Sequence, residues 1–123
     1  MKVSILVPIY NVEKFFSRCL ESLFSQTYPN IEYVFVNDCT PDNSMDVLHN
    51  FMEKYPQRAN MVKIINNATN LGIAIVRNIL LENATGDYIL FVDSDDWVES
   101  DMVEQFVENV RHTDADIVGC DYY

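Results

Sequence analysis

Hydrophobic and polar positions follow two spacings along the chain, one typical of strands and the other typical of helices. Short, mostly apolar runs occupy residues 3–9, 31–36, 62–65, 88–92 and 117–120. Runs of this kind are typical of parallel strands that are covered on both faces. Between the runs, apolar residues recur every three or four positions, which is the helical spacing.

The helical spacing is clearest after the first run, where apolar residues stand at 12, 15, 16, 19, 20, 23 and 24. It predicts a helix from Val12 to Phe24, before the turn signal Tyr28-Pro29-Asn30. Three more helices are predicted, one from Asp42 or Ser44 to Tyr55 that Pro56 ends, one around 75–80 that Gly86 closes as its C-terminal glycine, and one after Ser100.

Strands and helices therefore alternate from the first residue to the last. This order predicts an α/β fold, a Rossmann-like, mostly parallel open sheet with helices on both faces. At 123 residues the chain has the length of one domain and can bury a sizeable core. It stops directly after a predicted strand, so we expect residues 1–123 to be part of a longer protein.

In an open parallel sheet, ligands bind beyond the carboxyl ends of the strands. The first four predicted strands end in polar residues, namely Tyr10-Asn11, Asn37-Asp38, Asn66-Asn67 and Asp93-Ser94-Asp95-Asp96. Asn and Asp are common in turns, so part of this pattern needs no ligand. The acidic group is the part that turn preference explains least.

Three carboxylates follow a buried apolar run within four positions, with no basic residue in the next ten. At this spacing Asp93 and Asp95 offer oxygen ligands that suit Mg²⁺ or Mn²⁺, and no His or Cys joins them. A bound cation would relieve the repulsion and retain open positions for an anion such as a diphosphate. The alternative is that these acids stabilise the N-terminus of the next helix, an interpretation that we favour for Asp96.

Three further residues have two readings each. Tyr10 could stack on a nucleobase or pack at the end of its strand. Asp38 could accept hydrogen bonds from a base or form an Asx turn into Thr40-Pro41-Asp42. Arg77 stands in an apolar stretch, where an arginine either extends its head to solvent or points at an anion.

Composition narrows the choice of partners. The formal net charge of −11 argues against nucleic acid or an anionic membrane surface, because both require clustered Lys and Arg. Three cysteines, Cys19, Cys39 and Cys120, form no CxxC pair and suit a reducing compartment. No apolar run is long enough to span a membrane, and the first residues lack the features of a signal peptide.

Five strings in order resemble the family 2 inverting glycosyltransferases, which have the GT-A fold. They are Val7-Pro8-Ile9-Tyr10-Asn11, Val36-Asn37-Asp38, Asn70-Leu71-Gly72 with Arg77-Asn78, Thr85-Gly86-Asp87-Tyr88, and Asp93-Ser94-Asp95-Asp96. Each string is weak alone, but the order and spacing over residues 3 to about 121 make the resemblance strong. It implies the donor-binding half of an enzyme that transfers a sugar from a nucleotide-diphosphate sugar, with UDP-sugars favoured, to a hydroxyl on a glycan or lipid-linked acceptor.

The resemblance also implies a role for each matching residue. Pro8, Tyr10, Asn11 and Glu13 would line the nucleoside pocket, Asp38 would bond the base, and Arg77 would approach the diphosphate. Asp93, Ser94 and Asp95 would be the Asp-x-Asp motif, with Asp95 the direct ligand of Mn²⁺ or Mg²⁺ and Asp93 nearer the ribose. The catalytic base of such enzymes belongs to the acceptor-binding half, so we expect it downstream and assign none here.

The chain departs from the family pattern after the second strand, where Asp38-Cys39-Thr40 replaces the common Asp-Gly-Ser. Losing the glycine removes an easy position for positive φ. The chain also has Ala74-Ile75-Val76 where the family often has small residues, a change that concerns helix packing.

Two other functions remain open. One is a non-catalytic module that binds nucleotide sugars, and the other is a receiver-like signalling domain. We expect a cytoplasmic location, with association of the full-length protein with the cytoplasmic face of a membrane left open.

Overall fold

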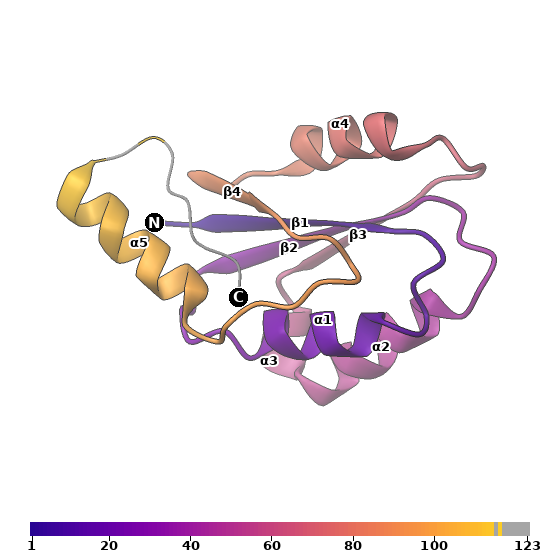
Figure 1. Ribbon diagram of the computed structural model, residues 1–123, viewed down its shortest axis with the longest axis horizontal. Coiled ribbons are helices and arrows are strands. Elements are labelled where there is room, and N and C mark those ends of the chain that lie inside the picture. The colour runs from indigo at the N-terminus through magenta and orange to yellow at the C-terminus, as the bar shows by residue number, and fades with distance from the viewer. Residues whose placement is uncertain (115, 117–123) are drawn as a thin grey trace.

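The computed structural model describes residues 1–114 and 116 (Figure 1). Its elements are β1 (Val3–Ile9), α1 (Phe16–Phe24), β2 (Ile31–Asn37), α2 (Ser44–Lys54), α3 (Pro56–Ala59), β3 (Val62–Asn66), α4 (Ile73–Asn83), β4 (Tyr88–Phe91) and α5 (Met102–Thr113). The first four predicted strands are confirmed. The predicted strand at 117–120, which contains Cys120, lies outside the described residues.

The four described strands form one parallel sheet in the order β3-β2-β1-β4. Strand β1 is central, and its Val3 stands opposite Ile31 of β2 and Tyr88 of β4. This confirms the predicted α/β sheet. The order also argues against the receiver-like alternative, because the 2-1-3 arrangement of receiver sheets would place β3 beside β1.

Helices cover both faces of the sheet, as predicted (Figure 1). On one face, alternate residues of β1 such as Ile5 and Val7 join a large core with residues of α1, α2 and α5. On the other face, Leu6 and Val34 pack against Val76 and Leu80 of α4 in a smaller core. The alternation follows from the pleat, which directs successive side chains to opposite faces.

Two predicted helix boundaries are wrong, whereas the predicted end of a helix before Pro56 is confirmed. Helix α1 begins at Phe16 rather than Val12, after a turn in which the Phe16 amide donates to the Val12 carbonyl. Pro56 ends α2 but also begins the short α3, because proline is well tolerated in the first helical turn. Helix α4 ends at Asn83, so Gly86 is not its C-terminal glycine.

Gly86 instead allows a close approach between the start of β4 and the start of β1. A Cβ at position 86 would lie 2.6 Å from Ser4 Oγ and 2.9 Å from the Lys2 carbonyl oxygen. The Gly86 amide donates to Ser4 Oγ at 2.8 Å, and the Lys2 amide donates to Asp87 at 2.9 Å. These contacts fix the register in which β4 enters the sheet.

The buried carboxylate of Glu32 strengthens the same junction. It accepts hydrogen bonds from the Ser4 hydroxyl and from the Thr85 amide and hydroxyl, and it lies 3.6 Å from Lys2 Nζ. Burial raises the pKa of Glu32, but these hydrogen bonds outweigh burial and lower the pKa to about 2. Glu32 is therefore held ionised inside the fold.

Candidate functional site

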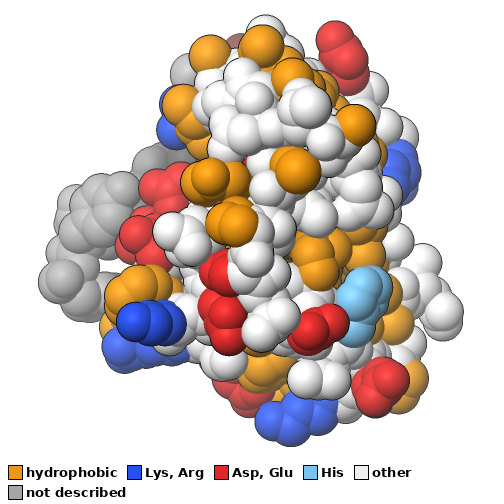
Figure 2. Space-filling view, turned by 90° about the vertical axis from the view of Figure 1, so that its right-hand side faces the viewer, with side chains coloured by type: hydrophobic (Ala, Val, Ile, Leu, Met, Phe, Trp, Pro, Cys, Tyr) orange, Lys and Arg blue, Asp and Glu red, His pale blue; other side chains and the backbone are white. Residues whose placement is uncertain are grey.

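The carboxyl ends of all four described strands lie at one edge of the sheet, because the strands are parallel and adjacent. Figure 2 views the molecule from this side and shows acidic side chains across the middle of the face, with apolar side chains above them over α4. The polar strand ends that the sequence singled out therefore share one surface. The order along it is Asn66, Asn37-Asp38, Tyr10-Asn11 and Asp93.

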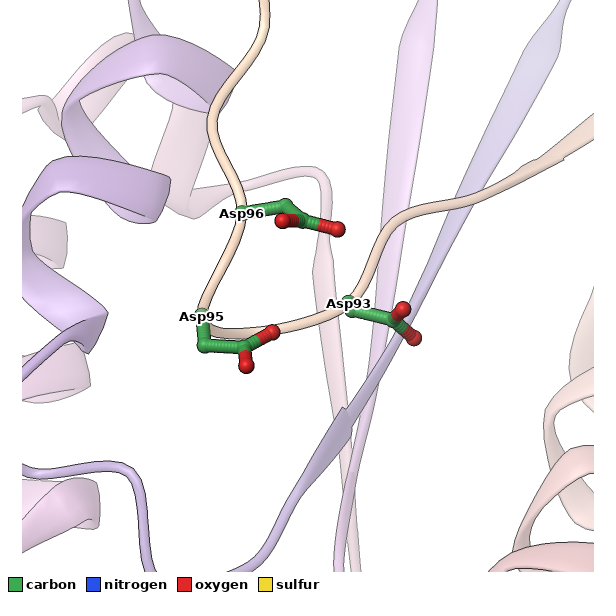
Figure 3. A group of neighbouring side chains, drawn as sticks. All are labelled: Asp93, Asp95 and Asp96. Carbon is green, nitrogen blue, oxygen red and sulfur yellow. The ribbon is translucent and has the colours of Figure 1, made fainter.

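The acidic group forms a compact cluster just beyond β4 (Figure 3). Carboxylate oxygens of Asp93, Asp95 and Asp96 all lie within 4.8 Å of one another, and all three residues are exposed. The Val92 amide still donates to the Leu6 carbonyl, and the Asp96 amide then donates to the Asp93 carbonyl at 3.0 Å. This tight turn, with the Ser94 side chain buried, brings the three side chains together.

Charge in the cluster changes the pKa of two neighbouring groups. Partial burial, followed by repulsion from Asp95 and Asp93, raises the pKa of Asp96. Burial in α1, with smaller contributions from the three aspartates, raises the pKa of the Cys19 thiol to about 12. Cys19 is thus the core residue that its helical position predicted.

The alternative in which these acids stabilise a helix N-terminus is not supported. Helix α5 begins at Met102, with Asp101 as its N-cap residue, so Asp96 lies well before the helix. Its carboxylate instead completes the cluster with Asp93 and Asp95. The interpretation of Asp96 as a start-of-helix residue was therefore wrong.

The donor set fits a hard divalent cation. All three groups present carboxylate oxygens, which Mg²⁺ and Mn²⁺ prefer. Opposite ligand oxygens around Mg²⁺ lie roughly 4.2 Å apart. Oxygens that already lie within 4.8 Å of one another could reach such positions by small side-chain rotations.

Asp38 has a structural task that the sequence did not reveal. Its buried carboxylate accepts hydrogen bonds from the Asn67 side chain at 3.0 Å and from the amides of Leu71 and Gly72 at 2.8 and 3.0 Å. Burial raises the pKa of Asp38, but the bonds from Leu71, Asn67 and Gly72 outweigh it and lower the pKa. Asp38 thereby ties the end of β2 to the segment that leads into α4.

The Asx-type contact predicted for Asp38 is made by its neighbour. Asn37 Oδ1 accepts the Thr40 amide at 2.9 Å, and Asn37 Nδ2 donates to Asn66 of β3. Cys39 then adopts φ +59°, so the loop keeps a left-handed residue although the family's glycine is absent. Its Sγ lies 3.5 Å from the Ala68 carbonyl oxygen.

The residues after β1 form the other side of this surface. Pro8 lies within β1 opposite Val36, and Tyr10 is 47% exposed, so its ring does not pack in the core. Asn11 has φ +56°, and its amide donates to Thr40 Oγ1. Glu13 accepts the Asn43 amide, so its side chain fastens this loop to the start of α2.

Arg77 lies on α4 beside an open groove of about 700 Å³ that also contains Asp93, Asp96 and Phe91. Its guanidinium carbon is 6.0 Å from the Phe91 ring centroid, and the residue is exposed. The structure thus brings Arg77, Asp93 and Asp96 to one groove, whereas Asp95 belongs to the acidic cluster but does not line the groove. Tyr10, Asn11, Glu13 and Asp38 do not line it.

Trp97 is a groove residue that sequence reasoning missed. Its ring is 44% exposed, and the guanidinium carbon of Arg18 from α1 lies 4.2 Å from the ring centroid. A large aromatic residue directly after three acids was the available signal, since such residues are usually buried.

The model of the family described as glycosyl transferase family 2 matches residues 4–123. The uncharacterized glycosyltransferase EpsJ of Bacillus subtilis is 43% identical over 121 residues, which are 98% of this chain and 34% of EpsJ. The poly(ribitol-phosphate) beta-glucosyltransferase of Bacillus spizizenii is 38% identical over 95% of this chain and 18% of that protein. The chain therefore spans about a third or less of the length of these relatives.

A solved structure agrees with the sequence comparisons. The crystal structure of Staphylococcus aureus TarS 1–349 in complex with UDP-GlcNAc has a TM-score of 0.84 and 28% identity, and it covers 99% of this chain and 37% of that one. The fold, the order of the motifs and these matches agree, and the chain belongs to glycosyl transferase family 2.

Proposed function

We propose that this chain is the donor-binding part of an inverting glycosyltransferase that uses a nucleotide-diphosphate sugar and Mn²⁺ or Mg²⁺. One observation carries the proposal. Three carboxylates converge where β4 leaves the sheet, beside the groove that contains Arg77. A diphosphate is an anion that such a cation site and an arginine would hold together.

Within this proposal, Asp95 is the direct metal ligand, Asp93 lies nearer the ribose and also supports the metal, and Asp96 adds a third oxygen. A bound divalent ion would neutralise charge on the leaving nucleoside diphosphate as a Lewis acid. Arg77 lines the same groove as Asp93 and Asp96, where its guanidinium would bind phosphate oxygens. Ser94 is not expected to contact a ligand, because its side chain is buried.

The nucleoside pocket would lie along the ends of β1 and β2. Tyr10 is exposed enough to stack on a base, while Pro8, Asn11 and Glu13 shape the loop around it. A carboxylate has about four acceptor positions, and Asp38 already uses three of them. Asp38 would therefore contribute to base binding through one further hydrogen bond and through the loop at 67–72.

A UDP-sugar is the favoured donor, since the TarS structure contains UDP-GlcNAc and resembles this chain over nearly its whole length. The acceptor would be a hydroxyl on a glycan or a lipid-linked glycan, and the reaction would take place in the cytoplasm. In the described part of the chain, none of the helices has the length and apolar character needed to cross a membrane.

Calorimetry of UDP binding to the full-length protein tests the donor site. We expect binding to require Mn²⁺ or Mg²⁺ and to weaken at least about tenfold in Asp95→Ala, as losses around a metal typically do. Asp46→Ala, which removes an exposed carboxylate from α2, is the matched control. Equal affinity in chelator and in metal would reject the metal site.

The remaining alternative is a non-catalytic module with the same donor site. Sugar transfer by the full-length protein to a mixture of glycan acceptors separates the two functions. Turnover with an inverted anomeric product supports the enzyme. Binding of the donor without turnover would favour the module.

A further inference from the structure

The loop that carries the acidic cluster runs from β4 to α5 along one side of α1 and the turn after it (Figure 1). Cys19 Sγ lies 3.7 Å from the Asp93 carbonyl oxygen, and the Val98 amide donates to Ser22 Oγ at 3.2 Å. The Thr27 amide donates to the Ser100 carbonyl at 2.8 Å. The loop at 93–101 is thus attached to α1 at several successive points.

Gln26 makes the most complete of these attachments. Its side-chain Nε2 donates to the Glu99 carbonyl at 2.6 Å and to the Ser22 carbonyl at 3.0 Å. Its Oε1 accepts the Val103 amide at 3.1 Å. Gln26 is only 4% exposed, so losing these bonds would leave buried polar groups without partners.

The bond to Val103 also caps α5 from the turn that follows α1. The N-cap residue Asp101 makes no side-chain capping bond, so the amide of Val103 in the first turn depends on Gln26. One amide side chain therefore closes the end of the acidic loop and starts the helix that follows it.

Hydrogen bonds from Arg58 fix the backbone of Gln26 and of the residues after it. Arg58 of α3 is 8% exposed, and its guanidinium donates to the backbone carbonyls of Gln26, Tyr28 and Pro29. Five hydrogen-bond donors in a planar group suit this task of holding several carbonyls at once.

We propose that Gln26 is a positioning residue, which holds the loop at 93–101 so that Asp93, Asp95 and Asp96 stay together. The inference rests on the proposed function for the purpose of that cluster, but Gln26 makes no hydrogen bond to a carboxylate of the cluster and does not itself line the groove. Its effect on metal binding would pass through the backbone of the loop.

The test compares Gln26→Leu with Tyr33→Phe in the full-length protein. Tyr33 of β2 is a matched control, because its buried hydroxyl donates to the Leu23 carbonyl of α1 and makes no hydrogen bond to the acidic loop. Hydrogen exchange of peptides that cover 93–103 and Mn²⁺ affinity by calorimetry are measured for both. We expect exchange about tenfold faster and Mn²⁺ binding about tenfold weaker in Gln26→Leu only.

The possible outcomes separate the two proposals. Unchanged exchange at 93–103 in Gln26→Leu, or equal changes in Tyr33→Phe, would overturn the role of Gln26. Faster exchange with unchanged Mn²⁺ affinity would also overturn it. If the unmodified protein binds no Mn²⁺, the proposed metal site is wrong, and exchange alone then decides whether Gln26 holds the loop. If Gln26→Leu does not fold, Gln26→Glu keeps the acceptor for Val103 and replaces the donor to Glu99 with an acceptor oxygen, so the attachment to Glu99 is lost and the same shifts are expected.

Discussion

Asp38 Oδ2 accepts a hydrogen bond of 3.0 Å from the amide of Gly72, which lies 34 residues further along the chain. Gly72 is the N-cap residue of α4, and no side chain of that helix caps its start. The carboxylate of Asp38 therefore supplies the cap from the end of β2, where negative charge also favours the helix dipole.

Removing that carboxylate should destabilise the fold. We expect Asp38→Ala to cost about 2–4 kcal/mol, because three donors in a buried site lose a charged acceptor. Asp38→Asn should cost less, since it keeps one acceptor oxygen. Urea unfolding measures both, with the exposed Asp46→Ala as control; a cost for Asp38→Ala no larger than that of the control would contradict the capping role.

Cys39→Gly should stabilise the protein. Cys39 has φ +59°, a left-handed conformation that costs a non-glycine residue roughly 1–2 kcal/mol. Glycine removes this strain but gains flexibility in the unfolded chain, so we expect a net gain of about 0.5 kcal/mol. Thermal unfolding measures the change, and Cys39→Ala, which keeps the strain, is the control. A lower melting temperature for Cys39→Gly than for Cys39→Ala would refute the expectation.

Alanine should have different effects at Gly72, which precedes α4, and at Gly86, which lies before β4 at the opposite edge of the sheet from the site. At Gly86 the new Cβ would clash with Ser4 and Lys2, and overpacking of this kind costs roughly 1–3 kcal/mol or more. At Gly72 no atom outside the chain neighbours lies within 4 Å of the new Cβ, so only the backbone strain at φ +91° and ψ 161° remains, which costs roughly 1–3 kcal/mol in this glycine-restricted conformation. Urea unfolding should therefore give a lower free energy of unfolding for Gly86→Ala than for Gly72→Ala. The reverse order would disprove the close contact at β4.

Acid should weaken the fold through Glu32. The pKa of Glu32 is about 2 in the folded protein against an ordinary value of 4.5, so its stabilisation is complete above pH 4.5 and disappears as pH falls toward 2. The full effect amounts to about 3 kcal/mol. Glu32→Gln should be less stable at pH 7 and lose much of this dependence between pH 4.5 and pH 2. Urea unfolding at several pH values checks this, with Glu53→Gln, which changes an exposed residue, as control. If the free energy of unfolding of Glu32→Gln and of the unmodified protein changed in parallel with pH, Glu32 would not be the source of the acid sensitivity.

Repulsion within the acidic cluster gives the last prediction. The pKa of Asp96 is raised by partial burial and then by repulsion from Asp95 and Asp93, so folding costs its ionised form free energy relative to the unfolded chain. Asp96→Asn should stabilise the metal-free protein slightly, by about 0.5 kcal/mol once solvent screening is allowed for. In the presence of Mn²⁺, Asp96→Asn should instead be less stable than the unmodified protein, because the variant loses a ligand oxygen. Melting temperatures of Asp96→Asn and the unmodified protein in chelator and in Mn²⁺ test this. If Mn²⁺ raised both melting temperatures equally, Asp96 would not be a metal ligand.

Much of this arrangement could be predicted from local patterns. The strand and helix spacing of β1, α1 and β2 is strong, and a parallel sheet necessarily gathers Tyr10, Asp38 and Asp93 at one edge. Family strings then suggested the chemistry of that edge.

Partners distant in sequence could not be predicted. The task of Asp38 depends on Leu71 and Gly72, and that of Gln26 depends on Glu99 and Val103. Gly86 was assigned to a helix end because glycine suits both a C-terminal cap and a close strand contact. Only the packing of β4 against β1 distinguishes the two.

That contact places a limit on chain length. Gly86 is fixed against Ser4 at one end of the strand, and the acidic cluster begins at Asp93 at the other, with residues 87–92 between them. Inserting or deleting one residue in this interval would turn every later side chain to the opposite face of the sheet. Homologous chains that keep both ends should therefore conserve this spacing even where the intervening residues differ, while loops that bear on neither end are free to vary in length.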